Sequence, residues 1–280
     1  MEHLTEEKLK ELNKKANQAR QLVIETLVEA GSGHTAGPLG MADIFISLYF
    51  HILKHDPKNP TLLDRDRLIL SNGHICPIQY VSLALSGYFE LDELKTLRKI
   101  NSRLQGHPHR MSPPGIETTS GPLGEGLSQS IGIALAAKLD NKDYYIYCLT
   151  SDGEHQEGNH WEAVMFAAKN KLSKIIQIVD RNYIQISGKT EDVMPIDPLV
   201  EKYKSFNWNV IEANGNNISN FITAVMKAKE CLDKPTVIIA KTVPGCGVSF
   251  MENDYLWHGK PPNKEEAHKA IEELKANAKS

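Results

Sequence analysis

The stretch that decides the fold is YYIYCLTSDG, residues 144–153, together with IIQIVDRN, residues 175–182. Each begins with a short apolar run rich in β-branched or aromatic residues, which predicts a strand, and each ends in polar residues. A helix-length segment separates the two runs, and a crossover of this length places two strands side by side in a parallel sheet. Asp152 and Asn182 then lie together at the carboxyl edge of the sheet, where ligands of such folds bind.

Asp152 and Asn182 supply a carboxylate and an amide oxygen, and a nearby backbone carbonyl can join them. Such hard oxygen ligands suit a Mg²⁺ ion that also carries phosphate oxygens. The plain alternative is an Asx turn after a strand, without metal. The second strand, with Asn182 about thirty residues after Asp152, favours the metal site over the turn.

The composition is that of an ordinary globular protein, with 280 residues, 41% hydrophobic and 24% charged. The net charge of −3 gives no general attraction to nucleic acid or to an anionic membrane. No apolar run approaches the roughly 20 residues that span a bilayer, and the acidic N-terminus is not a signal peptide. Four scattered cysteines without metal or redox spacing predict reduced thiols and a cytoplasmic protein.

Strand and helix patterns alternate along the chain, which predicts an α/β fold with a doubly wound, mostly parallel sheet flanked by helices. We expect a single domain over residues 1–280, with an N-terminal helix over 4–30 and a C-terminal helical tail over 264–279. The expected strands are 67–70, 144–150, 175–179, 209–212 and 236–240, and the other expected helices are 41–53, 77–86, 91–99, 127–139 and 218–231.

Four histidines lie beside glycines in separate predicted loops: His34, His74, His107 and His258. A single histidine of this kind is more often a turn or capping residue. Four around one pocket could hold a polar ligand and move its protons near neutral pH. Residues 106–126 form a long loop rich in Gly, Pro, Ser and Thr, and loops of this length are usually functional.

The segment GPLGEG, residues 121–126, removes side chains where a flat ring or a diphosphate must approach the backbone. The helix that follows adds backbone N–H groups for an anion. The plain alternative is a loop that only caps this helix.

In this order, the motifs resemble those of the transketolase family. Residues 151–153 with Asn182 resemble its thiamine diphosphate motif Gly-Asp-Gly…Asn, with Ser151 in place of the first glycine. The four histidine loops resemble its histidine motifs, and GPLGEG resembles Gly-Pro-Leu-Gly-Gln-Gly. The resemblance covers roughly residues 10–262 and implies the diphosphate-binding domain of that family.

The resemblance also implies the cofactors and their ligands. Thiamine diphosphate binds with Mg²⁺, for which Ca²⁺ or Mn²⁺ could substitute. Asp152, Asn182 and the backbone carbonyl of Ile184 would hold the metal. The implied cofactor-binding residues are His74, Gly121, Pro122, Leu123, Gly124, Asp152, Gly153, Glu157, Glu162, Asn182, Ile184 and His258, and the implied catalytic residues are His34, His74, His107 and His258.

Glu157 and Glu162 match acidic positions that communicate across a subunit interface in the family, although solvated helix charges explain them about as well. The implied reaction, in carbohydrate metabolism, transfers a two-carbon ketol unit from a ketose phosphate to an aldose phosphate. The glutamate that activates thiamine belongs to a pyrimidine-binding domain, and Ser280 follows soon after the last histidine motif. We therefore expect a separate C-terminal subunit, with two copies of each chain in a heterotetramer.

Three alternatives stay open from the sequence. The first is a relative that acts on an unusual sugar, such as a sulfonated or branched one. The second is a non-catalytic binding subunit, which Ser151 in place of glycine favours. The third is a Mg²⁺-dependent phosphohydrolase with Asp152 as nucleophile, disfavoured because Glu154 stands where such enzymes often carry a second aspartate.

Overall fold

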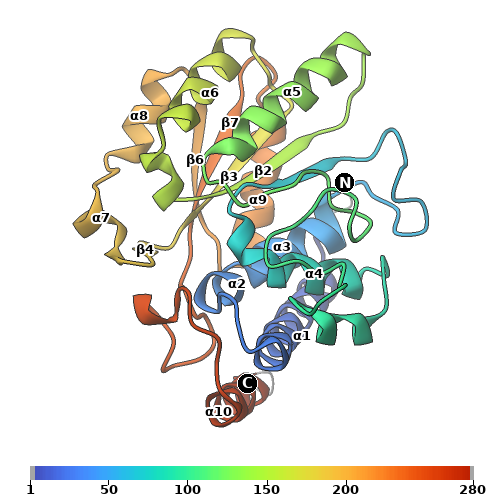
Figure 1. The fold of residues 1–280 in the computed structure, drawn as a ribbon. Coiled ribbons are helices and arrows are strands. Elements are labelled where there is room, and N and C mark those ends of the chain that lie inside the picture. Colours follow the sequence, from blue (N-terminus) through green and yellow to red (C-terminus); the bar gives the residue numbers. More distant parts are fainter. Residues whose placement is uncertain (1–3, 278–280) are drawn as a thin grey trace.

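A five-stranded sheet forms the centre of the molecule in a computed structural model that describes residues 4–277 (Figure 1). The strand order is β1 (Arg67–Leu70), β2 (Ile146–Ser151), β3 (Ile175–Arg181), β7 (Thr236–Lys241) and β6 (Asn209–Asn214). Every pairing in this sheet is parallel. The predicted doubly wound α/β fold is therefore confirmed.

Helices cover both faces of the sheet because the central strands are apolar on both sides. Ile146 and Cys148 of β2 pack under α5 (Glu125–Leu139), α6 (Gly158–Lys169) and α8 (Leu199–Ser205). Tyr147 and Leu149 point to the opposite core, formed with α3 (Ala42–Ser47), α4 (Cys76–Leu85) and α9 (Ile218–Glu230). On this second side, α1 (Glu6–Ala30) packs against α3, α4 and α10 (Lys264–Asn277) (Figure 1).

The predicted elements recur with shifted ends. Helix α1 starts at Glu6 because the Thr5 side chain caps it, accepting a hydrogen bond from the backbone N–H of Lys8. The expected helix over 41–53 is divided into α3 and a π-helical turn, Leu48–Ile52, and a separate short helix that was not expected, α2 (Ala36–Gly40), precedes it. Only Leu91–Thr96 of the expected helix over 91–99 is helical, as a 3-10 helix. Residues 1–3 of the predicted domain and residues 278–279 of the predicted tail lie outside the described residues.

The carboxyl ends of β2 and β3 meet at one edge, where Ser151 is paired with Asp180. Strand β3 runs two residues beyond its predicted end, so Asp180 and Arg181 belong to the strand. A short hairpin follows, β4 (Ile184–Gln185) and β5 (Gly188–Lys189), and then α7 (Thr190–Val193). The predicted long loop reaches α5 at Glu125. No helix among the described residues is long and apolar enough to cross a membrane.

Candidate active site

A cavity of about 320 Å³ opens at the carboxyl edge of the sheet. It gathers most of the residues that the sequence singled out: His34, His74, His107, Gly121, Leu123, Asp152, Gly153, Glu157, Ile184 and His258. Pro122, Gly124, Glu162 and Asn182 are not among its lining residues. Ser151, Gln156, Gln185 and Ile186 line it as well, and the last three were not among the predicted site residues.

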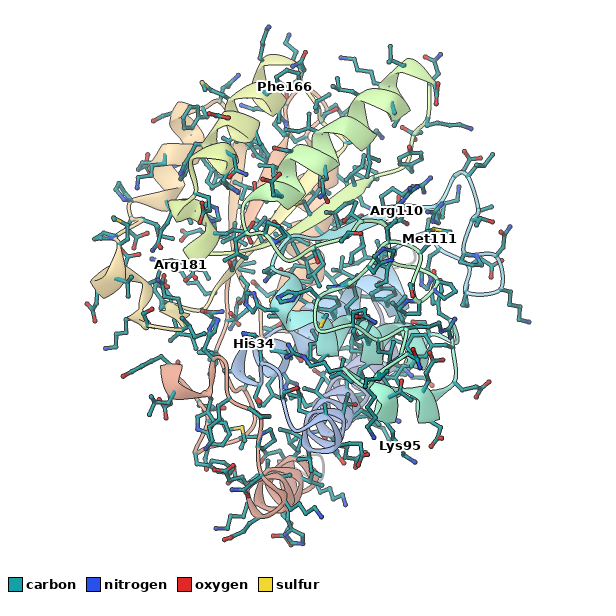
Figure 2. All side chains as sticks on the ribbon, viewed as in Figure 1. His34, Lys95, Arg110, Met111, Phe166 and Arg181 are labelled. Carbon is teal, nitrogen blue, oxygen red and sulfur yellow. The ribbon has the colours of Figure 1, made fainter. Side chains whose placement is uncertain are left out.

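Three of the four histidines form a tight cluster near the middle of the molecule, where Figure 2 labels His34. The ring centroids of His34 and His74 are 4.9 Å apart, those of His74 and His258 are 5.2 Å apart, and those of His34 and His258 are 5.6 Å apart. His34 precedes α2, His74 lies in a 3-10 turn after β1, and His258 follows another such turn. His107 joins them from the long loop, so four distant segments converge on the cavity.

Burial keeps these imidazoles neutral at pH 7. It lowers the pKa of His34 to about 4 and that of His258 to about 4, and it lowers the pKa of His74 well below its ordinary value. Each neutral ring carries one N–H and one bare nitrogen. The Nδ1 atoms of His34 and His258 are buried without a hydrogen-bond partner in the described chain, which leaves both able to bond a ligand.

Asp152, completely buried after β2, lies at the predicted edge position. Its Oδ1 accepts hydrogen bonds from the backbone N–H of Gly153 (2.7 Å) and the hydroxyl of Thr190 (3.3 Å). Its Oδ2 accepts from the backbone N–H of Tyr183 (2.8 Å) and from Nη1 of Arg181 (3.1 Å). Burial raises the pKa of Asp152 to about 6, although these donors act in the opposite direction.

Arg181 contacts the proposed metal ligand Asp152, and the sequence analysis did not predict any role for it. Its side chain, labelled in Figure 2, is 2% exposed, and its guanidinium forms ion pairs with Asp152 (3.1 Å), Glu191 (2.6 Å) and Asp197 (2.9 Å). It also stacks 4.0 Å from the ring centroid of Tyr183, a residue held at a φ of 64°. A bulky residue at positive φ is costly, so these contacts hold the turn after β3 in place.

Asn182 and Ile184 complete the predicted metal-ligand set on this turn. The Asn182 Oδ1 accepts a hydrogen bond from the Ile184 backbone N–H (3.0 Å), and its amide donates to Asp180 (2.8 Å). This accounts for the absence of Asn182 from the cavity wall: it is 6% exposed and faces the turn. One lone pair of its Oδ1 remains available to a cation.

The donor chemistry of this turn fits a hard divalent cation, since carboxylate, amide and carbonyl oxygens are what Mg²⁺ prefers. Asp152 already accepts four hydrogen bonds, so a metal must replace one of the two long ones, from Thr190 or Arg181. Among residues 4–277 no cluster of three or more His, Cys, Asp or Glu side chains could hold a metal. The predicted set contains one such side chain and depends on neutral oxygens for the rest.

The glycine loop before α5 approaches its neighbours closely. Gly124 has a φ of 83°, and a Cβ there would lie 2.4 Å from the Asn159 Oδ1. The expectation that the start of this helix offers backbone N–H groups to an anion does not hold for Gly124 and Gly126, whose N–H groups already have partners. The N–H of Gly124 donates to Glu154, and the N–H of Gly126 donates to the Ser71 hydroxyl, because these acceptors pack directly under the loop.

Ser151, which departs from the glycine of the family motif, is the last residue of β2 and is not among the residues with positive φ. Serine therefore imposes no backbone strain at this position. Its backbone N–H and hydroxyl both contact the Glu154 carboxylate. The observation that favoured a non-catalytic subunit thus loses its physical basis.

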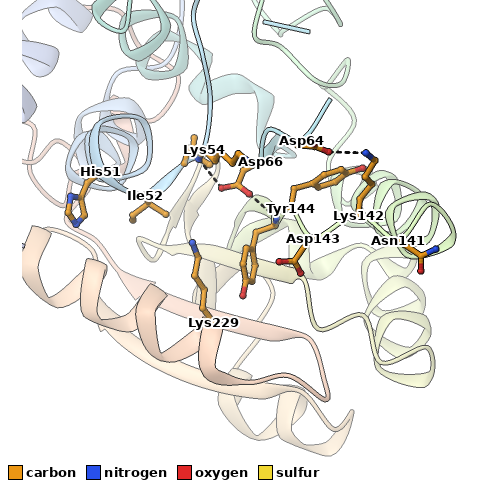
Figure 3. Close-up of a pocket in the computed structure, with 12 residues that line it drawn as sticks. His51, Ile52, Lys54, Asp64, Asp66, Asn141, Lys142, Asp143, Tyr144 and Lys229 are labelled. Atoms are coloured by element: carbon orange, nitrogen blue, oxygen red, sulfur yellow. Dashed lines mark hydrogen bonds and ion pairs between the residues drawn. The ribbon is translucent and has the colours of Figure 1, made fainter. Parts of the chain in front are cut away.

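A larger cavity, of about 730 Å³, lies at the opposite edge, where β2 begins (Figure 3). Asp66 in its wall accepts hydrogen bonds from the backbone N–H groups of Lys54 (2.9 Å) and Tyr145 (2.8 Å), and Lys142 pairs with Asp64 (2.9 Å). It contains none of the predicted site residues. The smaller cavity is the candidate active site because the convergent polar groups lie there.

Comparison with known proteins agrees with this assignment. Residues 12–280 match the family described as transketolase, thiamine diphosphate binding domain. The chain is 38% identical to the 6-deoxy-6-sulfo-D-fructose transketolase subunit SqwG of Clostridium sp. (strain MSTE9), covering 94% of this chain and 96% of that relative. It is 40% identical to an apulose-4-phosphate transketolase subunit of Actinobacillus succinogenes, covering 95% and 96%.

Solved structures agree with the fold. The transketolase of Campylobacter jejuni superposes with a TM-score of 0.89 at 38% identity, covering 94% of this chain but 42% of that one. The chain therefore spans about two fifths of that transketolase, but nearly the whole length of the two subunits above. By sequence match, fold and the geometry of the cavity, the chain belongs to the transketolase family and carries its thiamine diphosphate-binding domain.

Proposed function

We propose that this chain is the diphosphate- and magnesium-binding subunit of a two-subunit transketolase. The enzyme transfers a two-carbon ketol unit from a ketose phosphate to an aldose phosphate. The observation that carries the proposal is the convergence of Asp152, Ile184 and four histidines on one cavity at the carboxyl edge of the sheet. Relatives of matching length that are named as transketolase subunits support the division into two chains.

The partner is a C-terminal subunit that carries the pyrimidine-binding half, with two copies of each chain in the assembly. Coverage of only about two fifths of single-chain transketolases supports this partner. The free thiols of all four cysteines support the cytoplasm as the compartment.

In this proposal Asp152, Asn182 and the carbonyl of Ile184 hold Mg²⁺, with Ca²⁺ or Mn²⁺ as possible substitutes. The backbone of the 121–124 loop and Gly153 face the cofactor, while Glu157 and Glu162 act toward the neighbouring subunit. Thiamine diphosphate, when bound, supplies the carbanion chemistry for two-carbon transfer. The chain itself supplies orientation, charge and proton transfer.

The histidine cluster holds the sugar and moves its protons. The bare nitrogens of His34 and His258 accept hydrogen bonds from substrate hydroxyls, and neighbouring ring N–H groups donate to carbonyl or phosphate oxygens. With thiamine diphosphate held here, the added negative charge would raise the pKa of these buried rings toward neutrality. At that pKa an imidazole transfers protons efficiently.

The deciding experiment is a calorimetric titration of thiamine diphosphate and Mg²⁺ into the chain mixed with its partner subunit. Asp152→Asn is expected to abolish Mg²⁺-dependent cofactor binding. The matched control, Asp64→Asn, removes an exposed carboxylate paired with Lys142 and should bind like the wild type. Unchanged affinity in Asp152→Asn would refute the metal assignment.

A second measurement tests the division into subunits and the reaction. The mixed subunits are assayed with a panel of ketose donors that includes sulfonated and branched sugars, as named for the relatives. Ketol transfer is expected only when both chains are present. Full activity of this chain alone, with cofactor and Mg²⁺, would end the two-subunit proposal.

A further inference from the structure

We propose that Glu154 is a positioning residue that holds together the three loops around the cofactor, and that Ser151 is part of this device. The inference rests on the proposed function, since it concerns the same site. Glu154 lies outside the set of residues that line the cavity. It acts on the cofactor only through the segments to which it is bonded.

The Glu154 side chain is completely buried and accepts four hydrogen bonds. Its Oε1 accepts from the Ser71 hydroxyl (2.5 Å) and the backbone N–H of Gly124 (3.2 Å). Its Oε2 accepts from the backbone N–H (2.9 Å) and the hydroxyl (3.3 Å) of Ser151. All of these donors are neutral, so the carboxylate is satisfied by hydrogen bonds and not by an ion pair.

The three bonded residues belong to three different parts of the site. Ser71 follows β1 and precedes the turn that carries His74, and Gly124 ends the glycine loop. Ser151 directly precedes Asp152, the proposed metal ligand. Between Ser71 and Glu154 lie more than eighty residues of chain, and the contact between them fixes the spacing of β1 and β2 at their ligand-binding ends.

The connection extends into helix α5. The Ser71 hydroxyl donates a hydrogen bond to Glu154 and accepts one from the backbone N–H of Gly126 (3.0 Å). These two hydrogen bonds link the start of the helix to the Glu154 carboxylate. A Cβ on Gly126 would lie 2.4 Å from the Ser71 Cβ, which shows how closely the two backbones approach. Glu154 therefore sets the distance between the glycine loop and the strand ends.

Only a group that accepts without donating satisfies this arrangement. Four donors converge on the two oxygens, and a carboxylate offers about four acceptor positions. A glutamine would direct its NH₂ group at one pair of these donors; the serine hydroxyl of that pair can rotate to accept, but the backbone N–H of Gly124 or Ser151 would be left buried without a partner. Ser151 contributes twice, because its hydroxyl also accepts from the backbone N–H of Glu154 (3.3 Å). A glycine at this position would lack both hydroxyl contacts.

The test compares Glu154→Gln with Asp66→Asn. Asp66 is also a buried carboxylate that accepts backbone N–H groups, but it lies at the opposite edge of the sheet (Figure 3). Both variants should have a lower free energy of unfolding than the wild type, measured by urea denaturation. In the full chain without cofactor, amide hydrogen exchange at Gly124 and Ser151 is expected to be at least about tenfold faster in Glu154→Gln than in Asp66→Asn, after correction for global stability.

The second readout is cofactor affinity at saturating Mg²⁺, measured in the complex with the partner subunit. Glu154→Gln should bind thiamine diphosphate about 10- to 100-fold more weakly than the wild type, the range seen when residues that support ligands are removed. Asp66→Asn should bind like the wild type. Equal losses in the two variants, or unchanged exchange and affinity in Glu154→Gln, would overturn the proposal.

Two milder variants keep the proposal testable if Glu154→Gln does not fold. Ser71→Ala should accelerate exchange at Gly126 and weaken cofactor binding, and Ser151→Gly should weaken binding although it restores the family's glycine. If neither variant changes amide exchange or cofactor affinity, the proposed role of Glu154 is contradicted. If the wild-type complex does not bind thiamine diphosphate, the proposed function fails instead, while the exchange experiment still tests the link between the loops.

Discussion

Replacing Arg181 with methionine separates the structural from the metal-related role of the buried ion pair. Methionine keeps the apolar stem and removes the guanidinium that contacts Asp152, Glu191 and Asp197. Glu191 and Asp197 are partly exposed and can turn to water. Asp152 is completely buried and would retain three of its four donors.

The expected magnitude follows from the burial of this pair. Removing one partner of a buried ion pair costs about 3–5 kcal/mol. For a chain of 280 residues, the unfolding entropy near the midpoint is about 0.6 kcal/mol/K, so Tm should fall by about 5 to 8 °C without metal. In the variant, saturating concentrations of Mg²⁺ and thiamine diphosphate should restore at least about 2 kcal/mol of the lost free energy of unfolding. The reason is that the divalent ion replaces the lost positive charge beside Asp152.

The assay is thermal unfolding of wild type and variant, once with EDTA and once with Mg²⁺ and cofactor. Arg20→Met is the matched control, because Arg20 is also buried and pairs with a buried carboxylate, Asp43 (2.5 Å), away from the cavity. It should lose similar stability, with no extra recovery on adding metal. An equal response of both variants to Mg²⁺ would refute the reasoning, as would a loss below about 1 kcal/mol in Arg181→Met.

Two further predictions use urea unfolding. Gly124→Ala should lower the free energy of unfolding by about 2 kcal/mol, because alanine is strained at a φ of 83°. Gly132→Ala, in open space within α5, should raise the free energy of unfolding by about 0.5–1 kcal/mol, because alanine favours a helix more than glycine does. Shifts of the same sign in the two variants would contradict this reasoning. Because burial holds the pKa of His34 and His258 near 4, the unfolded chain binds more protons below about pH 6.5. The stability that these two rings contribute should therefore fall as the pH drops from 6.5 toward 4, by up to about 1.4 kcal/mol per pH unit and ring, while the raised pKa values of the buried Asp152, Glu154 and Asp180 carboxyls act in the opposite direction. His258→Asn should flatten this slope between pH 7 and 5, and an unchanged slope would rule out its contribution.

Local patterns in the sequence were enough to predict the framework. Strand β1, Arg67–Leu70, lies where its apolar run predicts, and β2 and β3 differ from their predicted ends by two residues or fewer. The placement of Asp152 next to the turn of Asn182 followed from the handed, parallel crossover between two buried strands, which depends on spacing and not on distant contacts. The four histidines could be identified as candidate site residues from the sequence, because each lies beside a glycine in a predicted loop.

The tertiary structure alone decided how the charges of the site are used. Glu154 and Arg181 look in sequence like solvated residues that follow strands, yet both are almost completely buried. Their burial depends on segments distant in the chain, such as Ser71 packing against Glu154, and hydropathy patterns do not encode which donor meets which acceptor. Amino-acid periodicity determines the faces of strands and helices, whereas the pairing of buried polar groups depends on distances that exist only after the loops have packed.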